Sequence, residues 1–177
     1  TAPKTITGEA REIVRETADR MRKARRAGRA IMLSFGAHTI KNGLAPVLIR
    51  LMEEGWLTHL ATNGAGIIHD WEFAFQGQSG EDVRRYVAEG QFGIWQETGY
   101  WINLAIVVGA YEGLGYGESV GALVEHAGLN LPSFEALKAA AAAVEQDSDK
   151  AAAAADLFGI MKRFELSPGP LAVKHSF

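Results

Sequence analysis

Hydrophobic residues in the first third of the chain change from helical spacing to a short continuous run. From Thr7 to Gly28 the apolar side chains return at the helical period, which predicts an amphipathic helix of about five turns. The apolar run at 30–35 shows no alternation with polar residues. It therefore predicts a strand that is buried on both faces of a parallel sheet.

A strand–helix–strand unit is predicted over residues 30–62. Pro46 suits the first turn of its helix, because that position needs no backbone N–H donor, and Gly55 suits the helix end. We expect the two strands to be parallel. The predicted elements are a helix at 44–55, a strand at 57–62, a tight turn at 63–66 and a helix at 67–75.

The rest of the chain has a largely helical pattern. The segment from Trp101 to Glu112 is apolar on nearly every side, and its length favours a buried helix over a strand. Two alanine runs add strong helix propensity. Further helices are predicted at 83–88, 118–128, 133–146 and 149–163, and a strand is predicted to begin at 171–173.

The whole pattern predicts an α/β fold, a Rossmann-like parallel sheet with a helix-rich C-terminal part. We expect one domain with an N-terminal helix at 1–28, a strand–helix–strand nucleotide site at 29–116 and a helical region at 117–177. A doubly wound sheet has about five or six strands, and the pattern supplies fewer. Either the sheet is small, or the sequence is the N-terminal portion of a longer nucleotide-binding domain, which is the interpretation we favour.

Composition excludes several classes of protein. Charged residues make up 22% of the 177 residues, which is ordinary for a globular chain and unlike a disordered one. The absence of cysteine excludes disulfides, thiolate metal sites and cysteine nucleophiles. The sequence contains no apolar run of membrane-spanning length and does not open on a signal pattern, so we expect a cytoplasmic protein without a membrane partner.

Charge is distributed unevenly along the chain. Residues 1–29 hold nine Lys and Arg against four Asp and Glu, whereas residues 30–177 hold nine against seventeen. A basic arm is one sign of nucleic-acid binding, but these cations gather in the last turns of a predicted helix, where they complement the helix dipole. They are accompanied by no nucleic-acid motif, so we expect no nucleic-acid partner.

Small and polar residues follow both predicted strands, where ligands bind in open α/β sheets. Such residues let a ligand approach the backbone, although a plain tight turn explains them as well, since the full Gly-x-Gly-x-x-Gly fingerprint is absent. Lys41 is either a solvated lysine or a group that reaches an anionic ligand, and it stays a candidate catalytic residue. The candidate cofactor-binding residues are Gly36, Ala37, His38, Asn63, Gly64, Ala65 and Gly66.

His69, Asp70 and Glu72 are the other candidate catalytic residues, and three interpretations of them remain open. The carboxylates could favour a helix N-terminus electrostatically. They could hold the cationic part of a substrate, with His69 on the same helix face as Glu72. His69 and Glu72 could also form a metal site with His38 or His59, but the spacing does not support one, so no metal ligand is assigned.

The stretch from Ile31 to Glu72 resembles the deoxyhypusine synthase family. In that family a strand leads into a turn and a helix start, and a second strand ends in a Thr-Ala-Gly-Gly turn followed by acidic residues. Ile40-Lys41-Asn42-Gly43 and Asn63-Gly64-Ala65-Gly66 occupy the corresponding places here. A second similarity is to the ornithine cyclodeaminase domain of arginine-catabolic enzymes. The residues that carry it are Asn63, Ala65, His69, Asp70, Glu72, Gly77 and Ser79.

Both relatives bind NAD on a Rossmann-like sheet and act on cationic amines. The resemblance therefore implies NAD as cofactor, held at both strand ends, a small cationic amine as substrate, and a homo-oligomer. It implies that His69, Asp70 or Glu72 faces the nicotinamide or the amine. Ala37 and His38 stand where the family has a polar Ser-Asn pair, and the Gly-Ser-Asp-Ser-Gly context of its catalytic lysine does not occur here. Transfer to a protein lysine is therefore not expected.

The leading hypothesis is a deoxyhypusine synthase-like NAD-dependent enzyme, a transferase or cyclodeaminase, that oxidises the amine of a polyamine or basic amino acid to an imine. Asp70 and Glu72 would hold the ammonium, and His69 would transfer a proton. The first alternative is a nucleotide-binding or regulatory domain without catalysis, and the second is an ornithine cyclodeaminase-like enzyme. The third alternative is a metal-dependent hydrolase that uses His38, His69 and Glu72.

Overall fold

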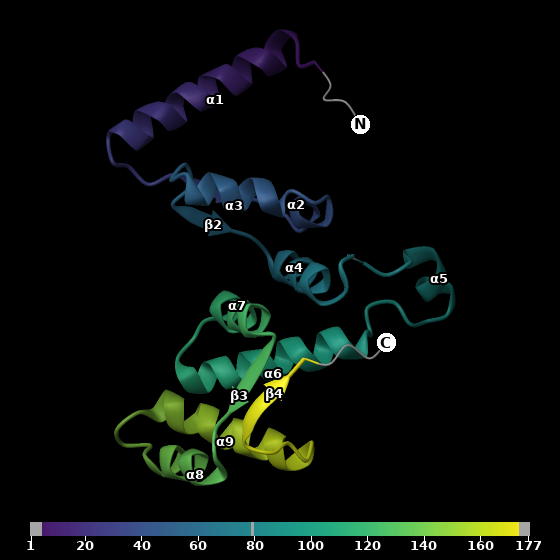
Figure 1. Ribbon diagram of the computed structural model, residues 1–177, viewed down its shortest axis with the longest axis vertical. Coiled ribbons are helices and arrows are strands. Elements are labelled where there is room, and N and C mark those ends of the chain that lie inside the picture. The colour runs from purple at the N-terminus through teal and green to yellow at the C-terminus, as the bar shows by residue number, and fades with distance from the viewer. Residues whose placement is uncertain (1–4, 79, 174–177) are drawn as a thin grey trace. The chain divides into compact units, whose positions relative to one another are not determined.

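The computed structural model of the chain describes residues 5–78 and 80–173 (Figure 1). The protein is a mixed α/β fold in which helices predominate. The described strands form two separate sheets of two strands each. The chain divides into two compact units, the first ending at Gly66 and the second starting at Ile67.

The first unit opens with α1 (Gly8–Arg26), which confirms the predicted N-terminal helix. Its apolar residues include Ile13 and Val14, both exposed, and none of its residues is buried. Ion pairs one turn apart, such as that of Arg15 with Glu12, run along the helix. Local charge pairing and helix propensity, rather than a packed core, therefore account for most of its stabilisation.

The parallel strand pair that the sequence predicts is formed by β1 (Met32–Ser34) and β2 (His59–Ala61). Between the two strands the chain forms α2 (His38–Lys41), which the spacing did not predict, and α3 (Ala45–Glu53). Pro46 lies in the first turn of α3, as its missing N–H requires. The predicted strand–helix–strand unit is confirmed, with one additional short helix.

The expectation that this strand pair is buried on both faces is wrong. Met32 is 67% exposed and Leu60 is 39% exposed, while Leu33 is half-buried. A parallel strand is buried when further strands flank it and helices cover both faces. In the part of the chain that the structure describes, β1 and β2 are joined by no third strand. The apolar run thus indicates residues that favour burial, but this two-strand sheet leaves several of them exposed.

The second unit is organised around α6 (Gln96–Glu112), a buried helix as its all-round apolar character predicts. It ends at Gly113, whose φ of 80° is the left-handed geometry of a helix C-cap. The neighbouring helix α7 (Tyr116–His126) packs closely at Gly109, where a Cβ atom would overlap the side chain of Ser119. A small residue on each helix therefore sets the close approach of α6 and α7.

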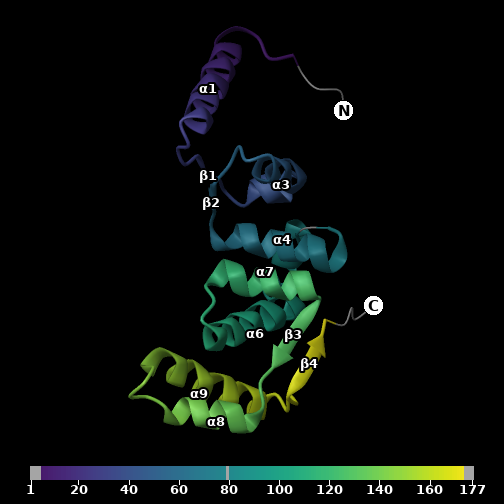
Figure 2. The ribbon, with the colours of Figure 1, turned by 60° about the vertical axis from the view of Figure 1, so that its left-hand side comes forward.

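Two hydrophobic clusters fill the second unit. Trp71 and Phe75 of α4 (Gly64–Gln76) stack with their ring centroids 5.1 Å apart, and they pack with residues of α6 and α7. The other cluster lies between α6, α8 (Phe134–Ala142) and α9 (Ser148–Arg163). Figures 1 and 2 show α8 and α9 side by side. The alanine runs permit this approach, because Ala154 of α9 is fully buried in the cluster.

A small antiparallel sheet completes the second unit. The strand predicted at 171–173 is confirmed as β4 (Gly169–Ala172), and it pairs with β3 (Gly128–Leu131). The sequence did not predict β3, because the helical pattern of α7 runs into it. α7 in fact stops at Ala127, whose φ of 48° turns the chain out of the helix.

The short helix α5 (Val83–Ala88) confirms the helix predicted at 83–88. The Asp82 side chain accepts a hydrogen bond from the Arg85 backbone N–H (3.0 Å) and so caps the helix. Ser79 of the cyclodeaminase-like motif lies outside the described residues. Within the described ranges, no helix is both long enough and apolar enough to cross a membrane.

Candidate functional site

The turns after β1 and β2 lie at the same edge of the parallel pair, because both strands run in one direction. β1 leads through Gly36 into α2, and the Thr39 N–H donates to the Gly36 carbonyl (3.0 Å). β2 leads through Thr62 and Asn63 into α4. The structure thus brings the predicted cofactor-binding residues of the first unit to one edge of the sheet.

The turn after β1 has exposed backbone next to one buried residue. Ala37 is 8% exposed and fixes the start of α2, while Gly36 and His38 are exposed. A Cβ atom at Gly36 would meet no atom within 4 Å, so the space beside this backbone is open. Lys41, half-buried at the end of α2, has no hydrogen-bond or ion-pair partner among the described residues.

The turn after β2 is organised by Asn63. Its side-chain Oδ1 accepts a hydrogen bond from the Gly66 N–H (3.1 Å), which is the arrangement of a helix N-cap. Gly66 is buried, and a Cβ atom there would lie 2.5 Å from Thr62 Oγ1. Gly66 therefore lets the helix start pack against the strand end, while Gly64 and Ala65 remain exposed.

The start of α4 corrects one interpretation of the acidic residues. Because the helix begins at Gly64 rather than at 67, its first turn contains no Asp or Glu. Favourable charge–dipole effects fade within the first turn of a helix. Asp70 and Glu72 lie beyond that turn, so stabilisation of the helix N-terminus does not explain them.

His69 and Glu72, both in the second unit, form a direct side-chain pair. Nδ1 of His69 lies 2.7 Å from Oε2 of Glu72, which confirms the shared helix face that their spacing predicts. Glu72 is 5% exposed, and the same oxygen accepts a hydrogen bond from the Gly80 N–H (3.0 Å). The buried carboxylate fixes one imidazole nitrogen, which leaves Nε2 as the nitrogen available for proton transfer.

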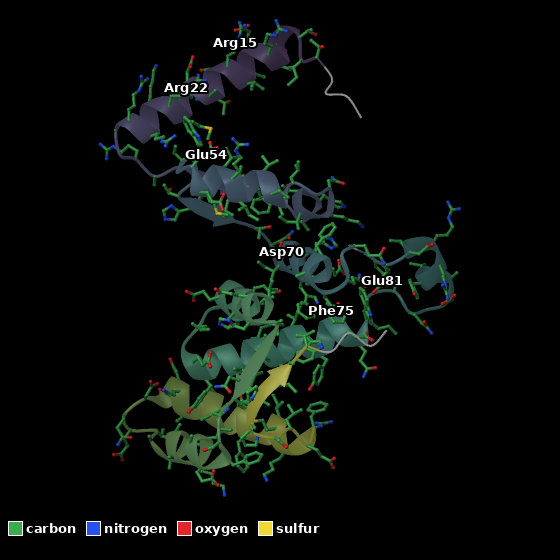
Figure 3. All side chains as sticks on the ribbon, viewed as in Figure 1. Arg15, Arg22, Glu54, Asp70, Phe75 and Glu81 are labelled. Carbon is green, nitrogen blue, oxygen red and sulfur yellow. The ribbon has the colours of Figure 1, made fainter. Side chains whose placement is uncertain are left out.

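Asp70 differs from its neighbour Glu72. Asp70 is labelled in Figure 3. It is exposed, and among the described residues its side chain has no hydrogen-bond or ion-pair partner. Partial loss of hydration around its carboxyl raises its pKa above the ordinary value. An unpaired and partly dehydrated carboxylate is suited to bind a cation, because a new partner restores its lost solvation.

A metal centre gains no support from the geometry. Among residues 5–78 and 80–173, His, Asp and Glu side chains form no group of three that could hold a metal ion. Nδ1 of His59, which the sequence left open as a ligand, instead lies 2.8 Å from Thr58 Oγ1.

A cleft of about 650 Å³ in the second unit was not predicted from the sequence. Its lining comes from the end of α4, from α5 and from the start of α6, and it includes Tyr86 and Trp95. The charges near it are already engaged: Glu81, labelled in Figure 3, accepts from the Gly93 N–H (3.0 Å), and Arg85 contacts Glu89 (2.9 Å). The cleft contains none of the predicted site residues.

Comparison of the chain with models of protein families, with curated proteins and with solved structures found no match. The resemblance to the deoxyhypusine synthase family therefore stays a prediction. The geometry at the sheet edge and around His69 is what supports a function.

Proposed function

We propose that the chain is a deoxyhypusine synthase-like NAD-binding protein that oxidises the amine of a polyamine or basic amino acid. The observation that carries the NAD-binding part is the sheet edge of the first unit. There Gly36, Gly64 and Ala65 are exposed at the ends of two parallel strands. Ligands of open α/β sheets bind at this edge.

The chemistry of this edge fits a dinucleotide. A pyrophosphate needs close approach to backbone N–H groups and a positive helix end, and the first turn of α4 has small side chains and no carboxylate. Asn63 uses its Oδ1 within the turn, so its Nδ2 remains as a donor to a ligand. The proposed cofactor-binding residues are Gly36, Ala37, His38, Asn63, Gly64 and Ala65, with Gly66 acting through the packing of the turn.

The proposed fold is a Rossmann-like sheet with more strands than β1 and β2. Exposed apolar side chains in the first unit support this, since Met32, Val47 and Met52 are each more than 40% exposed. Scattered single apolar residues are ordinary at a surface, but a strand and an adjoining helix that both expose them indicate a missing neighbour. Further strands, or a second copy in a homo-oligomer, would cover these residues.

The proposed reaction assigns separate tasks to the residues of α4. Bound NAD would supply the hydride acceptor. Asp70 binds the substrate ammonium, and as a hydride leaves the amine-bearing carbon, His69 accepts the proton that the nitrogen releases. The products are the iminium form of the substrate and the reduced cofactor. Glu72 is too buried to bind a substrate directly, so it orients His69 through the contact with Nδ1.

Substitution of Ala65 by Trp tests the NAD site. We expect NAD at millimolar concentration to raise the melting temperature of the protein and Ala65→Trp to remove this shift, because the indole would occupy the space of the ligand. Ala74→Trp is the matched control, since Ala74 is also exposed on α4 but lies outside the proposed cofactor residues. Absence of a shift in the unsubstituted protein, or equal loss in both variants, would count against the site.

A nucleotide-binding domain without catalysis is the second candidate. It is favoured by the hydrogen bond from the Gly80 N–H to Glu72, which gives that carboxylate a structural task in holding the loop. The two candidates differ in whether NADH forms when spermidine, ornithine or arginine is added. If the chain is an enzyme, NADH should form, and His69→Gln should lower the rate of its formation by about 10²–10⁴-fold while NAD binding is kept. Bound NAD without any turnover would favour the second candidate.

A further inference from the structure

A second cleft, of about 380 Å³, lies in the first unit at the edge of the sheet where β1 and β2 begin. Because the strands are parallel, this edge is opposite to the one proposed for NAD. The cleft is lined by the end of α1, the segment that leads into β1 and the turn that precedes β2. The polar side chains that line it are those of Arg25, Arg29, Thr58 and His59.

The guanidinium of Arg25 is held in place by an aromatic ring. Its central carbon lies 4.3 Å from the centroid of the Trp56 ring. This cation–π contact holds the guanidinium at the ring and leaves its N–H groups available to an anion. The neighbouring carboxylate, Glu54, is already bound by Arg50 at 2.7 Å (Glu54 is labelled in Figure 3). The residues that line the cleft include no Asp or Glu.

Arg29 adds a second cation that the helix does not account for. It lies beyond the end of α1, after Gly28 with its φ of 61°, so complementing the helix dipole is not its task. Its backbone N–H donates to the Ala24 carbonyl (2.9 Å), which fixes the start of its side chain. Within the described part of the chain, its guanidinium has no carboxylate partner.

Thr58 and His59 form the opposite part of the lining. The Thr58 hydroxyl accepts from the Ile31 N–H (2.9 Å), contacts the Ile31 carbonyl (3.1 Å) and lies 2.8 Å from His59 Nδ1. Because the hydroxyl has one proton, donation to the carbonyl requires that Nδ1 of His59 donates to the hydroxyl. Nε2 of His59 is then the nitrogen left for a ligand, and it becomes a donor when the ring is protonated.

We propose that this cleft binds the phosphate group of a small phosphorylated molecule. The two guanidinium groups provide more positive charge than one carboxylate needs, and the imidazole adds a further nitrogen that faces a ligand; this set suits a phosphate group. The volume lies at the lower end of the range for small-molecule sites, about 300–1,000 Å³. A concave site suits a compact ligand better than it suits the extended backbone of a nucleic acid. The site is independent of the proposed NAD site.

An NMR titration of the full chain with inorganic phosphate at constant ionic strength tests the proposal. We expect saturable shifts of backbone amides within 28–31 and 55–59. Arg29→Gln should weaken binding by about tenfold or more, which is the loss of one charge-assisted hydrogen bond. Arg26→Gln is the matched control, because Arg26 is also exposed in the last turn of α1 but does not line the cleft, and it should change the affinity by less than about twofold.

Several outcomes would overturn the proposal. Shifts that grow without saturation, or an equal loss of affinity in Arg26→Gln and Arg29→Gln, would show only general attraction of anions to a basic surface. If a single-stranded oligonucleotide bound more tightly than phosphate and shifted amides along all of α1, the ligand would be a nucleic acid and not a small molecule. Competition with inorganic phosphate by glucose 6-phosphate, but not by glucose, would support a phosphorylated metabolite as the ligand. Binding of inorganic phosphate without any binding of glucose 6-phosphate would restrict the ligand to the free ion. NAD binding should be unchanged in Arg29→Gln, so failure here leaves the proposed function intact.

Discussion

At the scale of single residues, the two carboxylates of α4 have different environments and therefore different properties. Glu72 is buried and shared between the His69 ring and the Gly80 N–H, so it has a defined structural partner on each side. Asp70, two positions earlier, is exposed and lacks a partner among the described residues. The sequence predicted the face shared by His69 and Glu72, because spacing alone fixes it. It could not predict Gly80, because that contact depends on the path of a loop.

Asp70→Asn should make the stability of the protein less dependent on pH. The pKa of Asp70 is raised in the folded state, so its carboxyl binds a proton more tightly there than in the unfolded chain. The folded state therefore loses stability as the pH rises from the unfolded to the folded pKa of this group. The variant should be the more stable protein at neutral pH, and this advantage should vanish below about pH 4. Urea denaturation at both pH values measures it. Asp156→Asn, at an exposed position of α9, is the control. The explanation would be refuted if this control gained the same stability at neutral pH, or if the gain in Asp70→Asn did not depend on pH.

Two glycines in helices should respond to alanine with opposite signs. Gly109→Ala should lower the free energy of unfolding by about 1–3 kcal/mol, because the new Cβ would overlap Ser119 where α6 crosses α7. Gly159→Ala, in α9 with no atom within 4 Å of a new Cβ, should raise it by about 0.5–1 kcal/mol through helix propensity. Chemical denaturation of the two variants is the test. A neutral Gly109→Ala would mean that the two helices can separate at little cost.

At the scale of elements, periodicity predicted what depends on local sequence. The parallel pair, α3 and α5 to α9 follow from apolar spacing together with glycine and proline signals. α2 and β3 were not predicted, since α2 is only four residues long and β3 depends on pairing with β4 far along the chain. The start of α4 was placed too late, because glycine and alanine at 64–66 indicate a turn as readily as a helix.

Hydrogen exchange should separate α1 from α6. No residue of α1 is buried, whereas α6 buries Trp101, Leu104 and Val108 among others. Local opening of α1 therefore exposes little apolar surface and costs little free energy. We expect the amides of α1 to exchange much faster than those of α6 when followed by mass spectrometry. Equal protection of the two helices would mean that the exposed apolar residues of α1 are covered in solution, as a homo-oligomer would do.

At the scale of the whole molecule, the sequence predicted the fold class but not its extent. The chain is mixed α/β with a parallel pair, yet the described part holds only two parallel strands, and the antiparallel pair forms a separate sheet. The number of strands beside β1 and β2 depends on neighbours that a local pattern does not specify. Both clefts were missed for the same reason, since each is lined by segments that only the folded chain brings together.

We propose that NAD binds at the edge of the parallel sheet where β1 and β2 end. The most direct measurement is a titration of the full chain with NAD, followed through its backbone amide signals by NMR. We predict saturable shifts concentrated at 36–38 and 63–66, with the amides of 28–31 and 55–59 unaffected. If NAD at millimolar concentration leaves the amides of 36–38 and 63–66 unchanged, the account of this site is contradicted.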